Sequence, residues 1–561
     1  MSAPAPPPTE TSPAPAIPAS ISGGSSNSSG SNGSHSKRTL DPVLRNALRY
    51  TVSAKEYEVL HKYLLSRAPS QVKNAAPRPK KYEAMISKDG SGSEYNIASV
   101  RASLRVFVAV YAGFKGWEVI SQKLFRRGQA KAVAAPPSPK HANARVAASF
   151  SLILLFHRLL YRFFTRLRSS LQESSADAFR ARNPRIARAL TSASTPAVGA
   201  SLAGLFLSLA PSSPLRSTIT IYVLVRSMEF SYNALEEARI IFSGGRPSWF
   251  GSWLLMPFCF GQLLHAFVFD RDCFPSGFGD FILRRSPEYI HTRPAGYPAS
   301  KPYPSTYDVV DGLASLTKIH WPPFTSPILF PNSLAKPAAT PALQIVRPLT
   351  SPAHPLTKHT SCAMLHPSDP SCSRTYLKFW LRSFPATLRI ITLIYSAFAL
   401  LSIRKLLHSP LEMTRRLTER ILRLSIFITG AIGTAWGSIC LFSSLLPRSF
   451  LPSQRFFLSG MLGGSFAYVA RRGERGNFLY CLRLSLDSVW KVGVKHGWWK
   501  GVRGGDVLLF TAALAAVGVV FENRPRAVSS GIVRKGLAWG RGEGWTDRVV
   551  VVGGKKGEKE E

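Results

Sequence analysis

LSIFITGAIGTAWGSICLFSSLL, residues 424–446, contains no charged side chain. A helix needs about 20 mostly apolar residues to cross the roughly 30 Å of hydrocarbon in a bilayer, so this stretch predicts a membrane-spanning helix. PSWFGSWLLMPFCFGQLLHAFVF (247–269) and GDVLLFTAALAAVGVVF (505–521) are similarly apolar. Several such segments in one chain predict an all-α, multi-pass transmembrane helical bundle.

Other segments are less decisive. Residues 389–403 predict a further span that extends backward through Phe384, and 192–235 predict two spans divided at 211–214. Another span is expected near 456–470. Three weaker candidates contain charged side chains. Residues 100–124 predict a span that hides charge in a bundle or an interfacial helix. Residues 146–164 predict a span whose basic side chains lie toward one end and reach the interface, and 478–494 predict a span or an amphipathic helix. We expect roughly six to ten spans in all.

The charge balance supports the same class. The 561 residues include 71 Lys plus Arg and 31 Asp plus Glu, a formal net charge of +40, yet charged residues are only 18% and apolar residues 45%. Basic residues beside long apolar runs are typical of membrane proteins, which collect Lys and Arg in loops that are not translocated. No nucleic-acid motif accompanies the charge. The expected partner is the lipid bilayer, with other membrane proteins or a second copy of the chain as further candidates, and no nucleic acid is expected.

Composition also divides the chain. The first 36 residues carry no Lys or Arg, so neither a signal peptide nor a transit peptide is predicted. Ser53 and Glu56 form a capping-box pattern that opens a short polar helix. The predicted parts are a disordered tail (1–38), a polar helical cap (39–90), a first membrane half (95–290), a Pro-rich hydrophilic loop that breaks any helix (291–375), a second membrane half with glycine-packed helices (376–545) and a charged tail (546–561).

Small residues recur at helical spacing in the second half. Thr429, Gly433 and Gly437 lie four positions apart in one span, and Gly460 and Gly464 repeat the pattern in the next. Small residues on one face let helix backbones approach closely in lipid, which favours a packed pair. The alternative is that glycine is simply common in membrane helices.

A histidine and cysteine run, HPLTKHTSCAMLHPSDPSC (354–372), contains residue types that bind zinc, namely His359, Cys362, His366 and Cys372. Their spacing matches no standard zinc finger, and no CxxC pair is present. The sequence therefore favours a solvated Pro-rich loop, and no metal and no cofactor is predicted.

Arg483 and Asp487, at i,i+4 spacing, form a second candidate group. They either neutralise one another within a bundle or line a polar pathway, and the sequence does not separate these two interpretations. No hydrolase elbow, P-loop, Rossmann fingerprint or HExxH motif occurs, so no catalytic residue is predicted and an enzyme is not expected.

Long blocks of the chain resemble fungal members of the transmembrane protein 135 family. The resemblance covers about residues 40 to 545. Its blocks are LDPVLRNALRYTVSAKEYEVLHKYLLSRAP (40–69), RDCFPSGFGDFILRRSPEYI (271–290), IHWPPFTSPILFPN (319–332), SCAMLHPSDPSCSRTYLKFW (361–380), FITGAIGTAWGSICLF (427–442) and DSVWKVGVKHGWWKG (487–501).

The resemblance implies an integral membrane protein of peroxisomes, mitochondria or both, linked to lipid metabolism and organelle dynamics. It also implies a distant relation to membrane proteins with glycine-zipper helices, which Gly433, Gly437, Gly460 and Gly464 would fit. No catalytic residues are carried over. Animal relatives have a cysteine-rich amino-terminal region, whereas this chain has only Cys259 and Cys273 before the central stretch.

Three mechanisms stay open from the sequence. A lipid or metabolite transporter or channel-like protein would use ionisable residues between glycine-packed helices. A membrane scaffold would recruit partners through its basic loops. A membrane enzyme would use the histidine and cysteine run and would contain bound zinc.

Overall fold

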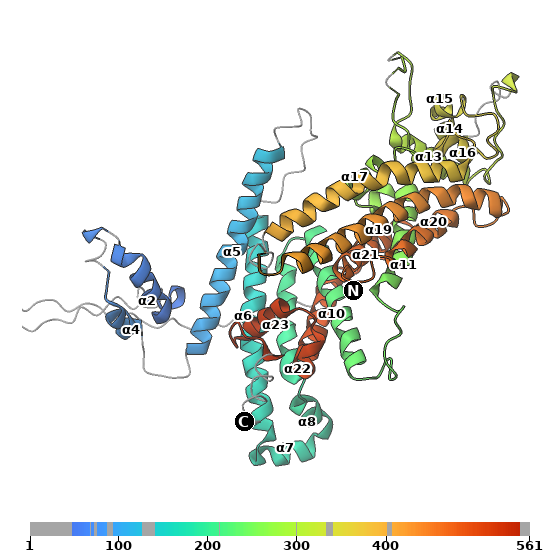
Figure 1. The fold of residues 1–561 in the computed structure, drawn as a ribbon. Coiled ribbons are helices and arrows are strands. Elements are labelled where there is room, and N and C mark those ends of the chain that lie inside the picture. The colour runs from blue at the N-terminus through green and yellow to red at the C-terminus, as the bar shows by residue number, and fades with distance from the viewer. Residues whose placement is uncertain are drawn as a thin grey trace, which may run out of the picture. The chain divides into compact units, whose positions relative to one another are not determined.

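Every regular element in the part of the chain that the structure describes is a helix (Figure 1). The computed structural model describes residues 48–67, 69–71, 76–86, 94–125, 141–212, 214–294, 296–298, 300–332, 340–400 and 407–549. Within these ranges no strand occurs, and one isolated bridge joins Pro323 to His359. The predicted all-α class is therefore confirmed. The predicted disordered tail (1–38) and the end of the predicted charged tail lie outside the described residues.

The chain divides into two compact units, residues 1–89 and 90–561. In the first, α2 (Ala54–Tyr63) begins with the predicted capping box: the Ser53 hydroxyl accepts from the Glu56 backbone N–H at 3.3 Å, and the Glu56 carboxylate accepts from the Ser53 N–H at 3.0 Å. Tyr57 stacks on Tyr82 of α4 (Pro79–Ile86), with ring centroids 3.9 Å apart. This aromatic pair is the centre of a small core, and Leu48, Val52, Ala54 and Leu65 pack against it.

Six helical segments of the second unit are long and apolar enough to cross a bilayer, which agrees with the lower end of the predicted range. Three coincide with the apolar stretches that predicted spans most strongly. The six segments lie in α5 (Glu94–Phe125), α6 (Ala142–Gln172), η4 with α11 (Ser252–Phe269), α17 (Cys372–Leu400), α19 (Pro410–Leu445) and α22 (Gly505–Asn523).

Other expected spans differ from the prediction. Within 192–235, α9 (Thr195–Ser201) continues into η3 (Leu202–Leu209), and this segment is bent by 84° from α8 (Pro184–Thr191), so the pair makes at most one broken span. Near 456–470, α20 (Gln454–Gly464) has 11 residues. At 1.5 Å per residue it is about 16 Å long, half the hydrocarbon thickness. This helix cannot cross a bilayer by itself.

The remaining helices are not among these six candidate spans. They are η1 (Leu65–Arg67), η2 (Ser174–Ala176), α7 (Asp177–Arg182), α10 (Pro214–Glu237), η5 (Arg271–Cys273), α12 (Ser276–Arg284), α13 (Thr306–Leu316), α14 (Pro341–Ile345), α15 (Arg347–Thr350), α16 (Thr360–Leu365), η7 (Ser465–Tyr468), α21 (Arg475–Lys495), η8 (Pro525–Ala527) and α23 (Gly531–Arg541).

The central stretch, 291–375, is not a hydrophilic loop. Helices α13 to α16 lie within it, and Val309, Val310 and Leu313 of α13 are fully buried in the core that α11 and α19 also form. The expectation that prolines would break every helix here is wrong because Pro341 opens α14 at its first turn, where a missing N–H costs nothing. A capping box formed by Ser305 and Asp308 starts α13.

The small residues of the second half lie at helix interfaces, but not all against the expected partner. A methyl group added to Gly460 would lie 2.3 Å from the carbonyl oxygen of Phe260, and one added to Gly464 would lie 2.6 Å from that of Met256. Helix α20 therefore touches the backbone of α11. Gly463, which the sequence did not single out, makes the equivalent contact with α19, 2.5 Å from the carbonyl oxygen of Ala431.

The small residues of α19 instead pack against aromatic side chains from other parts of the chain. Gly433 faces the ring of Phe379 on α17, at 2.6 Å from an added methyl group, and Gly437 faces Tyr289 and Tyr376. Thr429 is buried at 1% exposure. In Figure 1, α17 and α19 run side by side, which agrees with their close packing. The two predicted glycine patterns thus serve different neighbours.

Replacing Gly460 by Ala should lower the free energy of unfolding by about 1–3 kcal/mol, because the methyl group would meet backbone atoms that cannot rotate away. Thermal unfolding of the purified protein in detergent measures the change. The matched control is Gly113→Ala in α5, where an added methyl group has no neighbour within 4 Å. Equal midpoints for the two variants would contradict the α11–α20 backbone contact.

Candidate functional site

An apolar cavity of about 220 Å³ lies between α11, α12, α19 and α21. Aromatic and aliphatic side chains supply nearly all of its wall. The lining residues are Phe260, Leu263, Leu264, Phe267, Phe274, Phe278, Phe281, Ile282, Leu424, Phe427, Ile428, Ala431, Ile432, Ala435, Trp436, Gly460, Asn477, Tyr480 and Cys481. Such a wall offers a hydrocarbon chain dispersion contacts and gives water few hydrogen-bond partners.

Packed aromatic rings and one buried hydrogen bond hold the shape of this cavity. Phe427 of α19 makes edge-to-face contacts with Phe260 of α11 (centroids 5.9 Å apart) and with Phe478 of α21 (6.0 Å). The Trp436 indole N–H donates to the Ser286 hydroxyl at 2.9 Å, so its one polar atom is satisfied although the ring is buried. The wall is therefore formed largely by rings in fixed positions.

Asn477, one of the few polar side chains on the wall, belongs to a polar cluster that lies outside the cavity. The Asn477 amide donates to the buried Glu474 carboxylate at 2.6 Å, and the Tyr395 hydroxyl donates to the same carboxylate at 3.2 Å. Arg420 lies 3.8 Å from this carboxylate.

Arg483 and Asp487 do not pair with one another. Asp487 binds Lys491 at 2.5 Å, and the Arg483 guanidinium lies over the rings of Tyr222 (4.9 Å) and Tyr480 (5.3 Å). The physical reason is the order of the charges: an acid followed four residues later by a base is the more favourable helical pair, whereas Arg483 precedes its acid. Arg483 consequently has no carboxylate partner among the described residues, and Tyr480 beneath it lines the cavity.

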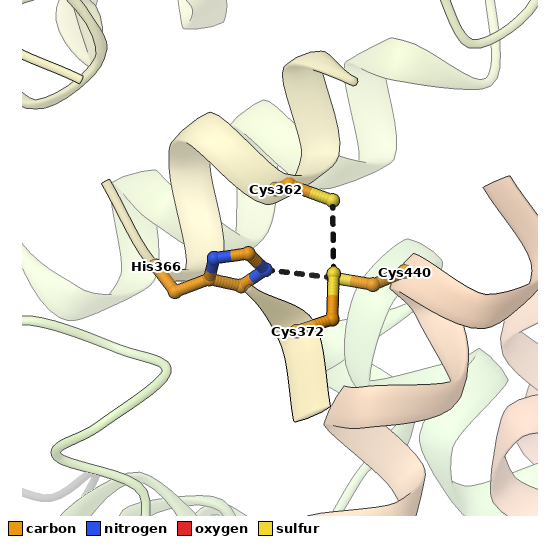
Figure 2. A group of neighbouring side chains, drawn as sticks. All are labelled: Cys362, His366, Cys372 and Cys440. Carbon is orange, nitrogen blue, oxygen red and sulfur yellow. Dashed lines mark hydrogen bonds between the residues drawn. The ribbon is translucent and has the colours of Figure 1, made fainter. Parts of the chain in front are cut away.

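A second group of side chains converges where α16, α17 and α19 meet. The donor atoms of four residues lie within 4.8 Å of one another: Cys362, His366, Cys372 and Cys440. Figure 2 shows these side chains gathered together. The Cys362 and Cys372 sulfurs are 3.7 Å apart, and the Cys440 sulfur lies 3.5 Å from His366 Nε2. Three thiols and one imidazole are a donor set that can hold a transition-metal ion.

Local structure places these donors. Cys362 and His366 are four residues apart, so one turn of α16 and its carboxyl-terminal cap bring them to the same side. Cys372 begins α17, and Cys440 lies in the carboxyl-terminal third of α19. Of the four predicted candidates, the structure brings together Cys362, His366 and Cys372. His359 is outside the cluster, since it precedes α16 and forms the bridge with Pro323.

Sequence reasoning missed Cys440. It lies in an apolar span, where a cysteine normally serves as a small buried residue. It is 74 positions from His366, too far for any motif. The i,i+4 spacing of Cys362 and His366 was the one local signal for two donors on the same helical face.

A third group links the end of α11 to the end of α21. The buried Asp270 carboxylate accepts from Lys495 at 3.0 Å and from His496 at 3.1 Å, and the exposed Asp272 accepts from the same Lys495 at 2.6 Å. Burial alone would raise the pKa of Asp270, but the hydrogen bonds and charges of Lys495 and His496 outweigh it and hold that pKa below its usual value. The ionised form of Asp270 therefore stabilises the fold.

Comparison with protein-family models, with curated proteins and with solved structures finds no match to this chain. What the protein does is therefore inferred from its own residues and from the geometry of these sites.

Replacing Asp270 by Asn should lower the free energy of unfolding at pH 7 by about 1–3 kcal/mol, because a buried charge-assisted contact is lost. The pKa of Asp270 is lower in the folded state than in the unfolded state, where it is about 4, so ionised Asp270 stabilises the fold above about pH 4. This stabilisation is lost as the pH falls through the folded-state pKa. The difference from wild type should therefore shrink in acid. Thermal unfolding in detergent across pH measures this, with Asp272→Asn as the exposed control, expected to have the smaller effect.

Proposed function

We propose that this protein binds a lipid within the membrane and, as a member of the transmembrane protein 135 family, supports lipid metabolism or organelle dynamics in peroxisomes or mitochondria. Its six apolar helices are those of a multi-pass membrane protein. The family and the organelle rest on the sequence blocks quoted above. The observation that carries the lipid proposal is the apolar cavity between α11, α12, α19 and α21.

The position of the cavity supports a lipid as its ligand. Two of its walls, α11 and α19, belong to segments apolar enough to cross a bilayer, so the cavity lies where acyl chains are the most abundant molecules. An acyl chain gains contact with the rings of Phe260, Phe267 and Phe427 at no cost in buried polar groups. A polar metabolite would leave its hydrogen bonds unmade against the same wall.

Arg483, which lies beside the cavity, supports a lipid with an anionic headgroup. Arg483 carries a positive charge with no carboxylate partner among the described residues, and it rests on Tyr480 at the wall of the cavity. A guanidinium matches the geometry of a carboxylate or a phosphate. A fatty acid or a phospholipid would thus place its chain in the cavity and its headgroup toward Arg483.

Replacing Ile428 by Trp should fill part of the cavity and reduce labelling by a photoreactive fatty acid about tenfold, equivalent to about 1.4 kcal/mol of lost binding. The control is Leu422→Trp, the same substitution at an exposed position of the same helix. Labelling is measured on detergent-purified protein, with unlabelled fatty acid as competitor and gel filtration to verify folding. Equal labelling of both variants would exclude this cavity as the binding site.

The organelle is tested by density-gradient fractionation of cells that express tagged protein, with each fraction washed in alkaline carbonate. The protein should remain in the membrane pellet and co-migrate with peroxisomal or mitochondrial markers. Release by carbonate would show that the apolar helices do not cross a bilayer. Retention with markers of another membrane would refute the organelle while leaving the membrane assignment intact.

A further inference from the structure

The cluster of Cys362, His366, Cys372 and Cys440 has the chemistry of a metal centre rather than of four unrelated core residues. We propose that it binds one zinc ion, which fastens the central helices α13 to α16 to the ends of α17 and α19. Zinc sites with a structural role are tetrahedral and closed, with four protein ligands, and three cysteines with one histidine are a standard set.

The distances suit this geometry. With Zn–S bonds of about 2.3 Å, two thiolates of a tetrahedral site lie about 3.8 Å apart, and a thiolate lies about 3.6 Å from a histidine nitrogen. The corresponding separations here are 3.7 Å between the Cys362 and Cys372 sulfurs and 3.5 Å between the Cys440 sulfur and His366 Nε2. All four donor atoms lie within 4.8 Å of one another, so a single ion can reach each of them.

The surroundings of His366 orient it for metal binding. Its Nδ1 lies 2.6 Å from the backbone carbonyl oxygen of Asp369. Because a carbonyl oxygen only accepts, Nδ1 carries the proton and Nε2 presents its lone pair to the three sulfurs. A metal-binding histidine usually has such a partner on its other nitrogen. The Asp369 carboxylate is itself held by Lys378 at 2.7 Å and by the Ser371 N–H at 3.1 Å.

Ordinary burial does not explain this convergence. Cys362, His366 and Cys440 are 2–4% exposed, and they come from two helices separated by α17 in the sequence. Cys259 and Cys481 show the ordinary case: each lies within a helix, and neither belongs to a group of metal donors among the described residues. Histidine is fully buried less often than aliphatic residues, so packing alone does not account for a buried histidine beside three thiols. Cys372, by contrast, is exposed and leaves a route by which an ion can enter.

The proposed ion explains how a Pro-rich stretch with short helices stays folded. Helices α14, α15 and α16 have between four and six residues, too few to be stable by themselves. Cys362 and His366 at the end of α16, bound together with Cys440 of α19, would tie this stretch to the membrane helices. Binding free energy in such a site adds to folding free energy.

The test is metal analysis of the full-length protein purified in detergent without added chelator. We expect about one zinc per chain, and less than about a tenth of that in Cys440→Ser and in His366→Ala, since a closed site loses affinity when any ligand is removed. Cys481→Ser and His359→Ala are matched controls, because neither residue belongs to the cluster, and both should keep their zinc. Zinc retained by Cys440→Ser, or lost equally from the controls, would overturn the proposal.

A second measurement does not depend on the variants folding. Wild-type protein loaded with Co²⁺ should show the visible absorption of a tetrahedral thiolate complex and lose it on addition of Zn²⁺. Alkylation without reductant distinguishes the main alternative, in which Cys362 and Cys372 are joined by a disulfide. Absence of the cobalt spectrum, together with two cysteines that alkylate only after reduction, would replace the zinc site with a disulfide.

Discussion

The contact between the backbones of α11 and α20 is the constraint on which the packing around the cavity depends. Lipid tails are as apolar as the surfaces of membrane helices, so the hydrophobic effect does not drive these helices together. They associate mainly through close packing. Gly460 and Gly464 allow that packing against α11, while Gly463 does the same against α19. Helix α20 therefore holds α11 and α19 at a fixed separation. The apolar cavity occupies space between these two helices, and Gly460 itself forms part of its wall.

Buried acids complete this framework at the ends of the helices. Glu474, at the amino terminus of α21, is 4% exposed and binds Tyr395 of α17 and Arg420 of α19. Glu229 of α10 is 6% exposed and binds Arg475, 3.1 Å away. A buried carboxylate is tolerated only where cations and hydrogen-bond donors surround it. These contacts fix α21, which supplies both a wall of the cavity and Arg483 beside it.

The sequence was a good guide wherever one helix decided the outcome. The apolar runs at 247–269, 424–446 and 505–521 and the Ser53–Glu56 capping box depend on local composition and spacing, and all four are present. It was a poor guide where distant segments meet. The prolines of the central stretch obscured helices that are stable only against α11 and α19. Cys440 resembled a core residue because the other three donors of the cluster lie far from it in the sequence.

The convergence of the four donors also sets an order of events during synthesis. Cys362 and Cys372 are 10 positions apart and leave the ribosome almost together, whereas Cys440 is 74 positions beyond His366. At 5–20 residues per second, the last donor follows by roughly 4 to 15 s. Until then the nascent chain contains three of the four donors, namely two thiols and one imidazole. The cluster becomes complete only when α17 and α19 have both been made and have come together as an antiparallel pair.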